Sequence, residues 1–304
     1  MNADHLTSSP ARDAAADPFP PSAYLVGAQK CATTFLANLL DQHPELQVSH
    51  PKEPDFFTVN RPYGLDWYRT CFPAASASVL LDASTSYSMA PTDPAEQTAA
   101  NPTHGVPDRI AAEAPRARIV YVVRDPVARA YSAYWHDVRT GYEDRPFRDA
   151  LAARTWYLDG SRYYFQSQRY IDRFGRERVL ILQMSEVTHR PAETCARVWR
   201  FLGLTPTALA SAAERPQNAS HTYTRVGELM FRNPRVRRVT KPVVRAGRRL
   251  LPTAVYDRVR AGLTRSIPQM TAAEREVVLN RLETDMTAFA ELTGIDYRPT
   301  ANKP

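Results

Sequence analysis

One short segment of this sequence carries the residue types that bind phosphate. The apolar run 23–26 is followed by a loop with a glycine, a lysine and two threonines, and then by the pattern of an amphipathic helix. Unpaired amide groups at a helix start and the helix dipole favour an anion, and a lysine adds a full positive charge. We therefore expect a phosphate-binding loop. Its candidate ligands are Gly27, Lys30, Cys31, Ala32, Thr33 and Thr34.

The spacing within this loop differs from that of nucleotide triphosphatases. Their pattern, G-x-x-x-x-G-K-[ST], would need glycine at Ala32 and lysine at Thr33. With lysine three residues after Gly27 and Thr-Thr at the helix start, the loop instead resembles the 5′-phosphosulfate loop of sulfotransferases that use 3′-phosphoadenosine 5′-phosphosulfate (PAPS), written K-x-G-T-T. Ala32 replaces the glycine of that pattern, and we expect it to be tolerated because its φ should be negative.

A second motif follows the apolar run 118–123. Arg124 would stand at the strand end, while Asp125 can cap the next helix and Pro126 suits its first turn. The donor fork of arginine fits phosphate oxygens, and Ser132 could add a hydroxyl facing the same anion. The segment resembles the sulfotransferase motif in which an arginine, and a serine eight residues later, bind the 3′-phosphate of PAPS.

A third motif, 50–57, resembles the K-E-P-H-F-F segment of heparan-sulfate-type sulfotransferases and their bacterial relatives. The resemblance implies that Glu53 is the catalytic base, which takes a proton from an acceptor hydroxyl or amine, and that Lys30 neutralises charge on the departing phosphate. Lys52 and Asp55 become candidate substrate contacts, with Asp55 in the family's usual histidine position. No metal is required by this chemistry. The alternative for Glu53 is a surface ion pair with Lys52, or a helix-cap role.

Two weaker matches concern cations near the predicted site. Ala83 replaces the lysine of the E-K-x-P-x-Y segment found in the heparan-type enzymes, so an acidic glycan would miss one positive charge. Arg225 lies where the donor-covering loop of the family falls, and the resemblance implies a second cation for the donor there.

Alternating apolar runs and helical patterns predict the fold. Short apolar runs, each followed by a loop and by helix-like periodicity, indicate a parallel sheet covered by helices, with ligands beyond the carboxyl ends of the strands. With the resemblance, this predicts an α/β protein with a P-loop-like three-layer fold, in which helices flank a central parallel sheet and the C-terminal part is helical. We expect strands at 23–26, 78–81, 118–123 and 178–182, and helices at 34–42, 127–140, 161–174, 192–202 and 272–292, the last two ended by Gly203 and Gly294.

Length and composition indicate one domain. The chain has 304 residues, 43% of them hydrophobic and 23% charged, as in ordinary globular proteins. Residues 1–22 resemble a disordered leader and not a secretory signal, so we expect a single domain at 23–298, a tail at 299–304 and a cytoplasmic protein. Within the domain, the Pro- and Arg-rich excursion 205–268 is a candidate lid.

The cysteines predict no special chemistry. Cys31, Cys71 and Cys195 lie far apart without C-x-x-C spacing, which indicates neither a zinc site nor a disulfide framework. We expect Cys31 to be a packing residue more than a reactive thiol.

The predicted function is sulfuryl transfer from PAPS to a small-molecule, glycan or lipid acceptor, with two alternatives. The first is an ATP-dependent small-molecule kinase, because the apolar run at 78–82 ends in Asp82 and imitates a magnesium site. The second is a non-catalytic binder of polyanions or membrane surfaces. It is suggested by the net charge of +7 and by the basic segment 229–256, which has no acidic residue and could contact anionic surfaces or form a solvated helical face. No nucleic-acid module is expected.

Overall fold

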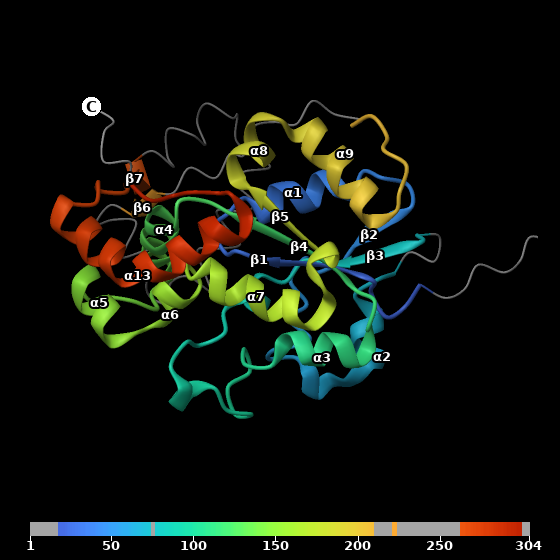
Figure 1. Cartoon of the computed structure of the whole chain (residues 1–304), viewed down its shortest axis with the longest axis horizontal. Coiled ribbons are helices and arrows are strands. Elements are labelled where there is room, and N and C mark those ends of the chain that lie inside the picture. The colour runs from blue at the N-terminus through green and yellow to red at the C-terminus, as the bar shows by residue number, and fades with distance from the viewer. Residues whose placement is uncertain (1–17, 74–76, 210–220, 224–261, 300–304) are drawn as a thin grey trace, which may run out of the picture.

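The computed structural model of the protein describes residues 18–73, 77–209, 221–223 and 262–299, and a parallel sheet of five strands forms its centre (Figure 1). The strands are β1 (Ala23–Gly27), β2 (Leu46–Val48), β3 (Val79–Asp82), β4 (Arg118–Val123) and β5 (Val179–Gln183). Their order is β2-β3-β1-β4-β5. Because β2 and β3 lie on one side of β1, and β4 and β5 on the other, the winding reverses beside β1, where open sheets bind ligands.

Helices cover both faces of the sheet, which confirms the predicted three-layer arrangement (Figure 1). One face carries α1 (Thr33–Leu40), α8 (Met184–His189) and α9 (Pro191–Leu202), and the other carries α3 (Val106–Glu113) and α7 (Tyr163–Phe174). The residues of α9 that are buried recur at helical spacing, so a single stripe of this helix packs on the core. They are Thr194, Cys195, Val198, Trp199 and Leu202.

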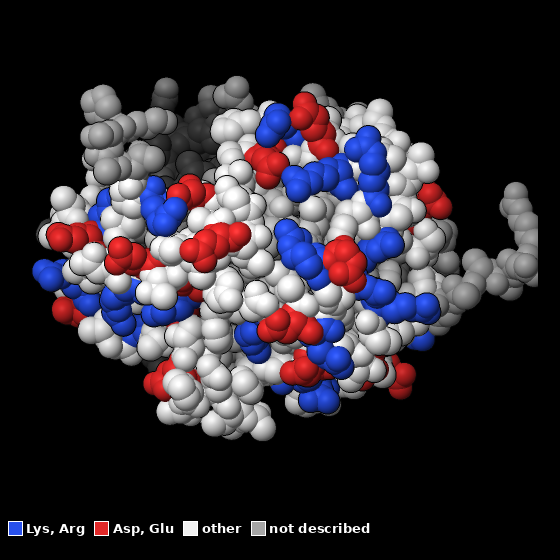
Figure 2. All heavy atoms as spheres, viewed as in Figure 1, with Lys and Arg blue, Asp and Glu red and all other residues white. Residues whose placement is uncertain are grey.

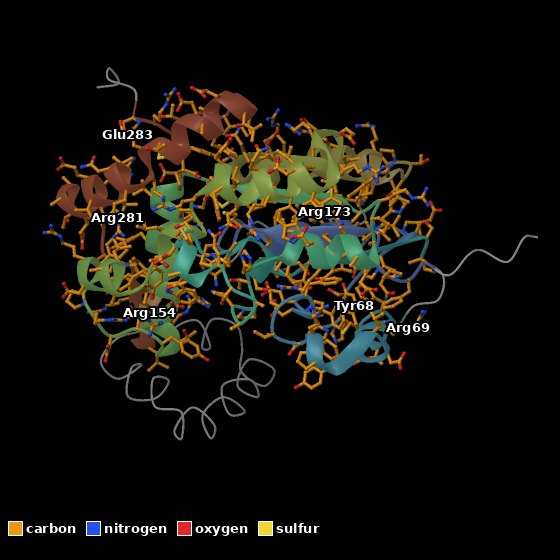
Figure 3. All side chains as sticks on the ribbon, turned by 60° about the horizontal axis from the view of Figure 1, so that its bottom comes forward. Tyr68, Arg69, Arg154, Arg173, Arg281 and Glu283 are labelled. Carbon is orange, nitrogen blue, oxygen red and sulfur yellow. The ribbon has the colours of Figure 1, made fainter. Side chains whose placement is uncertain are left out.

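An aromatic cluster extends the core beyond the sheet. The short helix α2 (Gly64–Thr70) carries the buried Tyr68 (Figure 3). The ring of Tyr68 stacks on that of Phe56 with 4.2 Å between centroids. Phe57 meets Tyr68 edge-to-face with centroids 5.7 Å apart. The two phenylalanines follow Asp55 directly, so this packing holds the third sequence motif in place.

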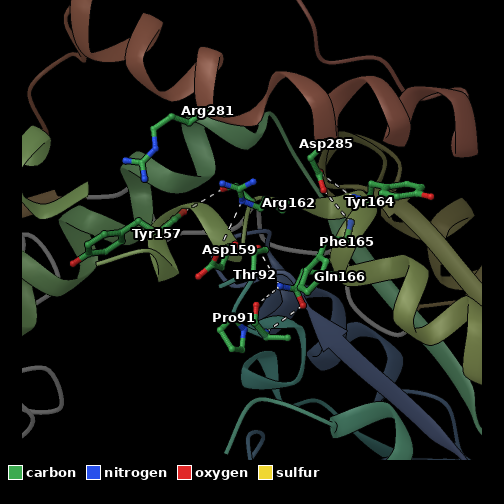
Figure 4. A network of polar contacts seen from close by, with 12 residues as sticks. Pro91, Thr92, Tyr157, Asp159, Arg162, Tyr164, Phe165, Gln166, Arg281 and Asp285 are labelled. Carbon is green, nitrogen blue, oxygen red and sulfur yellow. Dashed lines mark hydrogen bonds and ion pairs between the residues drawn. The ribbon is translucent and has the colours of Figure 1, made fainter. Parts of the chain in front are cut away.

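A second core lies beside the sheet, where the long C-terminal helix α13 (Ala272–Thr293) packs against α4 (Pro126–Thr140), α5 (Phe147–Ala153) and α6 (Trp156–Asp159). A capping box formed by Thr271 and Glu274 starts α13, and Gly294, with φ of 74°, ends it. Asp285 on α13 accepts hydrogen bonds from the amides of Tyr164 (3.0 Å) and Phe165 (2.9 Å) at the start of α7 (Figure 4).

The other elements in the described ranges are short. They are an antiparallel pair, β6 (His221–Tyr223) and β7 (Thr264–Ser266), and four 3-10 helices, η1 (Arg61–Tyr63), η2 (Thr85–Ser88), η3 (Pro94–Glu96) and η4 (Arg176–Arg178).

Most predicted elements are confirmed with small shifts at their ends. β4 has the predicted bounds, β1 ends one residue later than predicted, and β3 and β5 each begin and end one residue later. Gly203 ends α9 with φ of 85°. The sequence patterns missed β2, α2, α3, α5, α6 and α8, because elements of three to eight residues are too short to show a clear period. The predicted leader and excursion fall largely outside the described residues.

Charge is mixed on the face of the molecule seen in Figure 2, where acidic and basic side chains are interspersed. The basic segment 229–256 lies outside the described residues. Among the helices that the structure describes, none combines the length and the apolar character needed to cross a bilayer.

Candidate active site

The predicted phosphate loop joins the central strand β1 to α1 at the carboxyl edge of the sheet. The amide of Ala28 donates to the oxygen of Val122 at 2.7 Å, so the loop begins as a continuation of the β1–β4 pairing. Helix α1 starts at Thr33, and among the described residues no side-chain oxygen caps it. Its first amides are therefore available to an anion. Thr33 is buried and Thr34 is exposed at this helix start.

The expectation of a negative φ at Ala32 is wrong. Ala32 has φ of 60° and ψ of 23°, and Lys30 has φ of 74°, so two residues of the loop are left-handed. A left-handed conformation destabilises an L-residue by about 1–2 kcal/mol, because its Cβ approaches the following carbonyl oxygen. The alanine in the glycine position of the pattern is thus strained.

Gly27 is required by close packing. Its φ is 150°, and a Cβ placed there would lie 2.0 Å from Ser88 Oγ and 3.3 Å from the ring of Tyr121. The loop can begin here only because this residue has no side chain. Direct contact of Gly27 with the donor stays a prediction.

The structure brings the first two motifs together. Arg124, directly after β4, donates from its guanidinium to the main-chain oxygen of Lys30 at 3.2 Å. As predicted, Asp125 caps α4, where its carboxylate accepts a hydrogen bond from the amide of Ala128 at 2.6 Å. Ser132 is buried on α4. The contacts of Arg124 and Ser132 with a 3′-phosphate stay predictions, and Arg225 lies outside the described residues.

The positively charged side chains of Arg124 and Arg139 lie near Lys30. Burial, followed by the charges of Arg139 and Arg124, lowers the pKa of Lys30 to about 8. Burial and the charge of Lys30 in turn lower the pKa of His136 to about 4. An anion bound among these groups would relieve their mutual repulsion.

Sequence reasoning missed His136 and Arg139, although a signal was present. They follow Ser132 by four and seven residues, and this spacing places all three on one side of α4. That side of the helix faces Lys30, as the electrostatic coupling of Lys30 to His136 and Arg139 indicates.

Lys52 lies between the phosphate loop and Glu53. Its Nζ donates to Glu53 Oε1 at 2.7 Å, to the main-chain oxygen of Ala83 at 3.1 Å and to Thr33 Oγ1 at 3.5 Å. The ion pair offered as the alternative for Glu53 therefore exists. It engages only Oε1, which Thr85 Oγ1 also reaches at 3.4 Å, while Oε2 has no hydrogen bond among the described residues. The side chain of Glu53 is 42% exposed and accessible to a substrate.

Asp55 stands on the same edge as Glu53. Its carboxylate accepts from Ser86 Oγ at 2.5 Å, and its amide donates to Ser84 Oγ at 3.0 Å. Burial raises the pKa of Asp55 above its ordinary value. These contacts fix the carboxylate in place beside the candidate base.

A cavity of about 350 Å³ joins the phosphate loop to these acidic residues. Gln29 of the loop lines it together with Glu53, Asp55, Glu96, Trp156 and Asp159. A molecule in this cavity can reach the candidate base and the loop at the same time.

The thiol of Cys31 and the carboxylate of Asp82 fit structural roles, while contact of the Cys31 backbone with the donor stays a prediction. Burial raises the pKa of the Cys31 thiol to about 11, so a packing role fits and a reactive thiolate does not. Asp82 is fully buried and accepts hydrogen bonds from Tyr68 Oη (2.6 Å), Tyr87 Oη (2.7 Å) and Ser84 Oγ (2.6 Å). Its oxygens face these hydroxyls, which argues against the magnesium site of the kinase alternative. Across the described ranges, no group of three or more His, Cys, Asp or Glu residues could hold a metal ion.

Comparisons with known proteins show a family, relatives and a solved structure to which the chain is similar. Residues 21–208 match the description of the sulfotransferase family. The bifunctional heparan sulfate N-deacetylase/N-sulfotransferase 2 of Homo sapiens is 30% identical over 209 residues, which cover 61% of this chain and 22% of that protein. Its Bos taurus counterpart is 28% identical over 211 residues, with the same coverage. A sulfotransferase structure from Alicyclobacillus acidocaldarius superposes with a TM-score of 0.63 at 22% identity, covering 91% of this chain and 96% of that chain, and has the same fold.

Proposed function

The chain belongs to the sulfotransferase family, and from this premise we propose that it transfers the sulfuryl group of PAPS to a hydroxyl or amine of a small-molecule, glycan or lipid acceptor. The observation that carries the proposal is the contact between Arg124 and Lys30, because it joins the two donor motifs at one edge of the sheet. In this proposal the 5′-phosphosulfate lies on the loop amides and Lys30, while the 3′-phosphate lies on Arg124 and Ser132.

The proposed reaction is an in-line displacement at sulfur. As the acceptor oxygen or nitrogen bonds to sulfur, the bond from sulfur to the 5′-phosphate oxygen breaks, and its electron pair stays on that oxygen. Glu53 takes the acceptor proton, and Lys30 neutralises the charge on the departing phosphate. Sulfuryl transfer then needs little beyond positioning and charge stabilisation, as phosphoryl transfer does.

The position of Lys52 supports a further role. Its ammonium lies within reach of both Thr33 in the donor loop and Glu53, so it can stabilise charge on the transferring group as well as orient the base. The curated relatives are named for heparan sulfate, which supports including glycans among the acceptors considered.

Calorimetric titration with 3′-phosphoadenosine 5′-phosphate (PAP) in EDTA tests the donor assignment, with ATP and 5′-AMP as comparison ligands. We expect metal-free binding that requires the 3′-phosphate and is lost in Arg124→Ala. A preference for magnesium-ATP over PAP would reject the proposal and favour the kinase alternative.

A further inference from the structure

The cavity beside Glu53 is acidic in a protein whose net charge is +7. Among its described lining residues are the four carboxylates Glu53, Asp55, Glu96 and Asp159, and no lysine or arginine. We propose that the acceptor is a small amino sugar or amino alcohol, whose protonated amine is bound by Asp55, Glu96 and Trp156 while a neighbouring hydroxyl faces Glu53. This inference rests on the proposed function, whose acceptor it specifies.

Two of the four carboxylates already have partners. Glu53 pairs with Lys52 at 2.7 Å. Asp159, which is buried, accepts from Thr92 Oγ1 at 2.6 Å and lies 3.9 Å from Arg162 Nε (Figure 4). These two groups therefore do not require a ligand for charge compensation.

Asp55 and Glu96 differ, because neither takes part in an ion pair within the part of the chain that the structure describes. The hydrogen bond that Asp55 accepts comes from the neutral hydroxyl of Ser86. Asp55 is half-buried, so its attraction to an ammonium group is only weakly screened, whereas Glu96 is exposed and adds a weaker attraction that solvent screens. Burial raises the pKa of Asp55 and the charge of Glu53 adds to this rise, while the hydrogen bond from Ser86 and the charge of Lys52 oppose it; a bound cation would oppose it further.

Trp156 supplies a second, independent feature for an ammonium group. Trp156 lines the same cavity as Asp55 and Glu96. The negative face of an aromatic ring attracts a cation, and tryptophan does so most strongly of the three aromatic side chains. Carboxylates together with an indole wall match a protonated amine better than they match a neutral or an acidic group.

Hydrogen bonds from Gln166 and Thr92 hold α6, the helix that carries Trp156, in place beside the cavity. Gln166 on α7 donates to the main-chain oxygen of Ala90 at 2.8 Å and to that of Asp159 at 3.1 Å, which ties the segment after η2 to α6 (Figure 4). The bond from Thr92 to Asp159 makes the same connection from the other side. The cavity is thus formed before a ligand binds, which reduces the entropy lost on binding.

Size and charge argue against an acidic polymer as the occupant. The cavity volume of about 350 Å³ is near the lower end of the range of about 300–1,000 Å³ for small-molecule sites. A sulfated or uronic-acid chain would place its anions against Asp55 and Glu96. Ala83, in the position of the lysine of the heparan-type pattern, adds no positive charge, and the nearby Lys52 is already paired with Glu53.

Three hexoses that differ mainly in charge test the inference: glucosamine, glucose and glucuronate, each titrated by calorimetry into the protein saturated with PAP. We expect glucosamine to bind at least about tenfold more tightly than glucose, and glucuronate to bind weakest. In Asp55→Asn and Glu96→Gln this preference should shrink while PAP affinity is unchanged. Asparagine tolerates the positive φ of 50° at Asp55, and Glu96 is exposed, so both variants should fold.

Glu193→Gln is the matched control, because Glu193 is an exposed acidic residue on α9 outside the cavity. The Glu193→Gln variant should prefer glucosamine over glucose as strongly as the unmodified protein does. Equal binding of the three sugars, absence of glucosamine binding, or a preference that persists in both cavity variants would overturn the inference while PAP still binds. Loss of PAP binding in the unmodified protein would instead reject the proposed donor.

Discussion

Arg124 donates a hydrogen bond to the main-chain oxygen of Lys30 at 3.2 Å, although 94 positions separate them in the sequence. Both residues follow strands that are neighbours in the sheet, β1 and β4, and parallel strands bring their carboxyl ends to one edge. The contact orients the arginine toward the loop and adds its charge to that of the lysine.

Replacing either cation should weaken PAP binding by about 10- to 100-fold, as expected for the loss of a charge-assisted hydrogen bond. Lys30→Ala should weaken PAP and 5′-AMP alike, because Lys30 is assigned to the 5′ side. Arg124→Ala should affect PAP far more than 5′-AMP, which has no 3′-phosphate. Calorimetric titration of each variant with PAP and with 5′-AMP measures these losses of affinity. Arg173→Ala, at an exposed position on α7, is the control (Figure 3), and equal losses for the two ligands in Arg124→Ala would contradict the assignment.

PAP binding should take up protons above pH 8. Burial and the charges of Arg139 and Arg124 lower the pKa of free Lys30 from 10.5 to about 8, and a bound phosphate raises it again. Below this pH Lys30 is already protonated, so Lys30 adds no pH dependence to the affinity for PAP there. Above it binding must recruit a proton, and Kd rises by up to about tenfold per pH unit.

Titrations in two buffers with different ionisation enthalpies measure this uptake, and Lys30→Gln should abolish it. His136, whose pKa is lowered to about 4, is neutral throughout this range and does not contribute. Proton uptake that persists in Lys30→Gln would assign the effect to another group.

Glu53→Gln should lower kcat by about 10²- to 10⁴-fold and leave PAP affinity nearly unchanged, because glutamine keeps the shape of the base but cannot accept its proton. The rate of PAP release with an acceptor found by screening measures kcat. If Glu53 serves only as the ion-pair partner of Lys52, the variant would lose little activity. Glu113→Gln, exposed at the end of α3, is the matched control.

Ala32→Gly should stabilise the protein by up to about 1 kcal/mol, because relief of the left-handed strain exceeds the extra entropy that glycine gives the unfolded chain. The urea midpoint of unfolding measures the change. Ala112→Gly, at an exposed position in α3 with ordinary helical geometry, should destabilise by about 1 kcal/mol. A loss of stability in both variants would contradict the left-handed backbone at Ala32.

Asp82→Ala should destabilise the protein by at least about 3 kcal/mol, because the hydroxyls of Tyr68, Tyr87 and Ser84 would lose their buried acceptor. Chemical unfolding measures this, with Asp82→Asn as the variant that keeps an acceptor oxygen.

The pKa of Asp82 should also make the stability of the protein depend on pH. Burial raises the pKa of Asp82 from 3.8 to about 6, so the native state holds this proton more tightly than the unfolded state. The part of the stability that comes from this bound proton is therefore present below pH 3.8 and is lost as pH rises through about 6, whereas the carboxylate still accepts its three hydrogen bonds above that pH. Asp82→Asn should remove that loss, and the stability difference between the two proteins should grow across this window and then level off.

The family and the fold class could be predicted from local patterns, and the same patterns supplied the residues proposed for the donor site. The apolar run before Gly27, the cap at Asp125 and the glycine stops at Gly203 and Gly294 depend on residues a few positions apart, whose geometry hardly changes with the rest of the fold. The family match and the solved structure confirm the predicted family and the parallel sheet.

Tertiary structure decided what depends on packing between distant segments. The left-handed Ala32, the position of Lys52 between Thr33 and Glu53, and the approach of Arg139 to Lys30 all arise where separate elements meet. The acidic cavity gathers side chains from the donor loop, the segment before α2, η3 and α6. No period in the sequence encodes such a gathering, because the distance between two side chains from different elements is set by how those elements pack and not by their spacing along the chain.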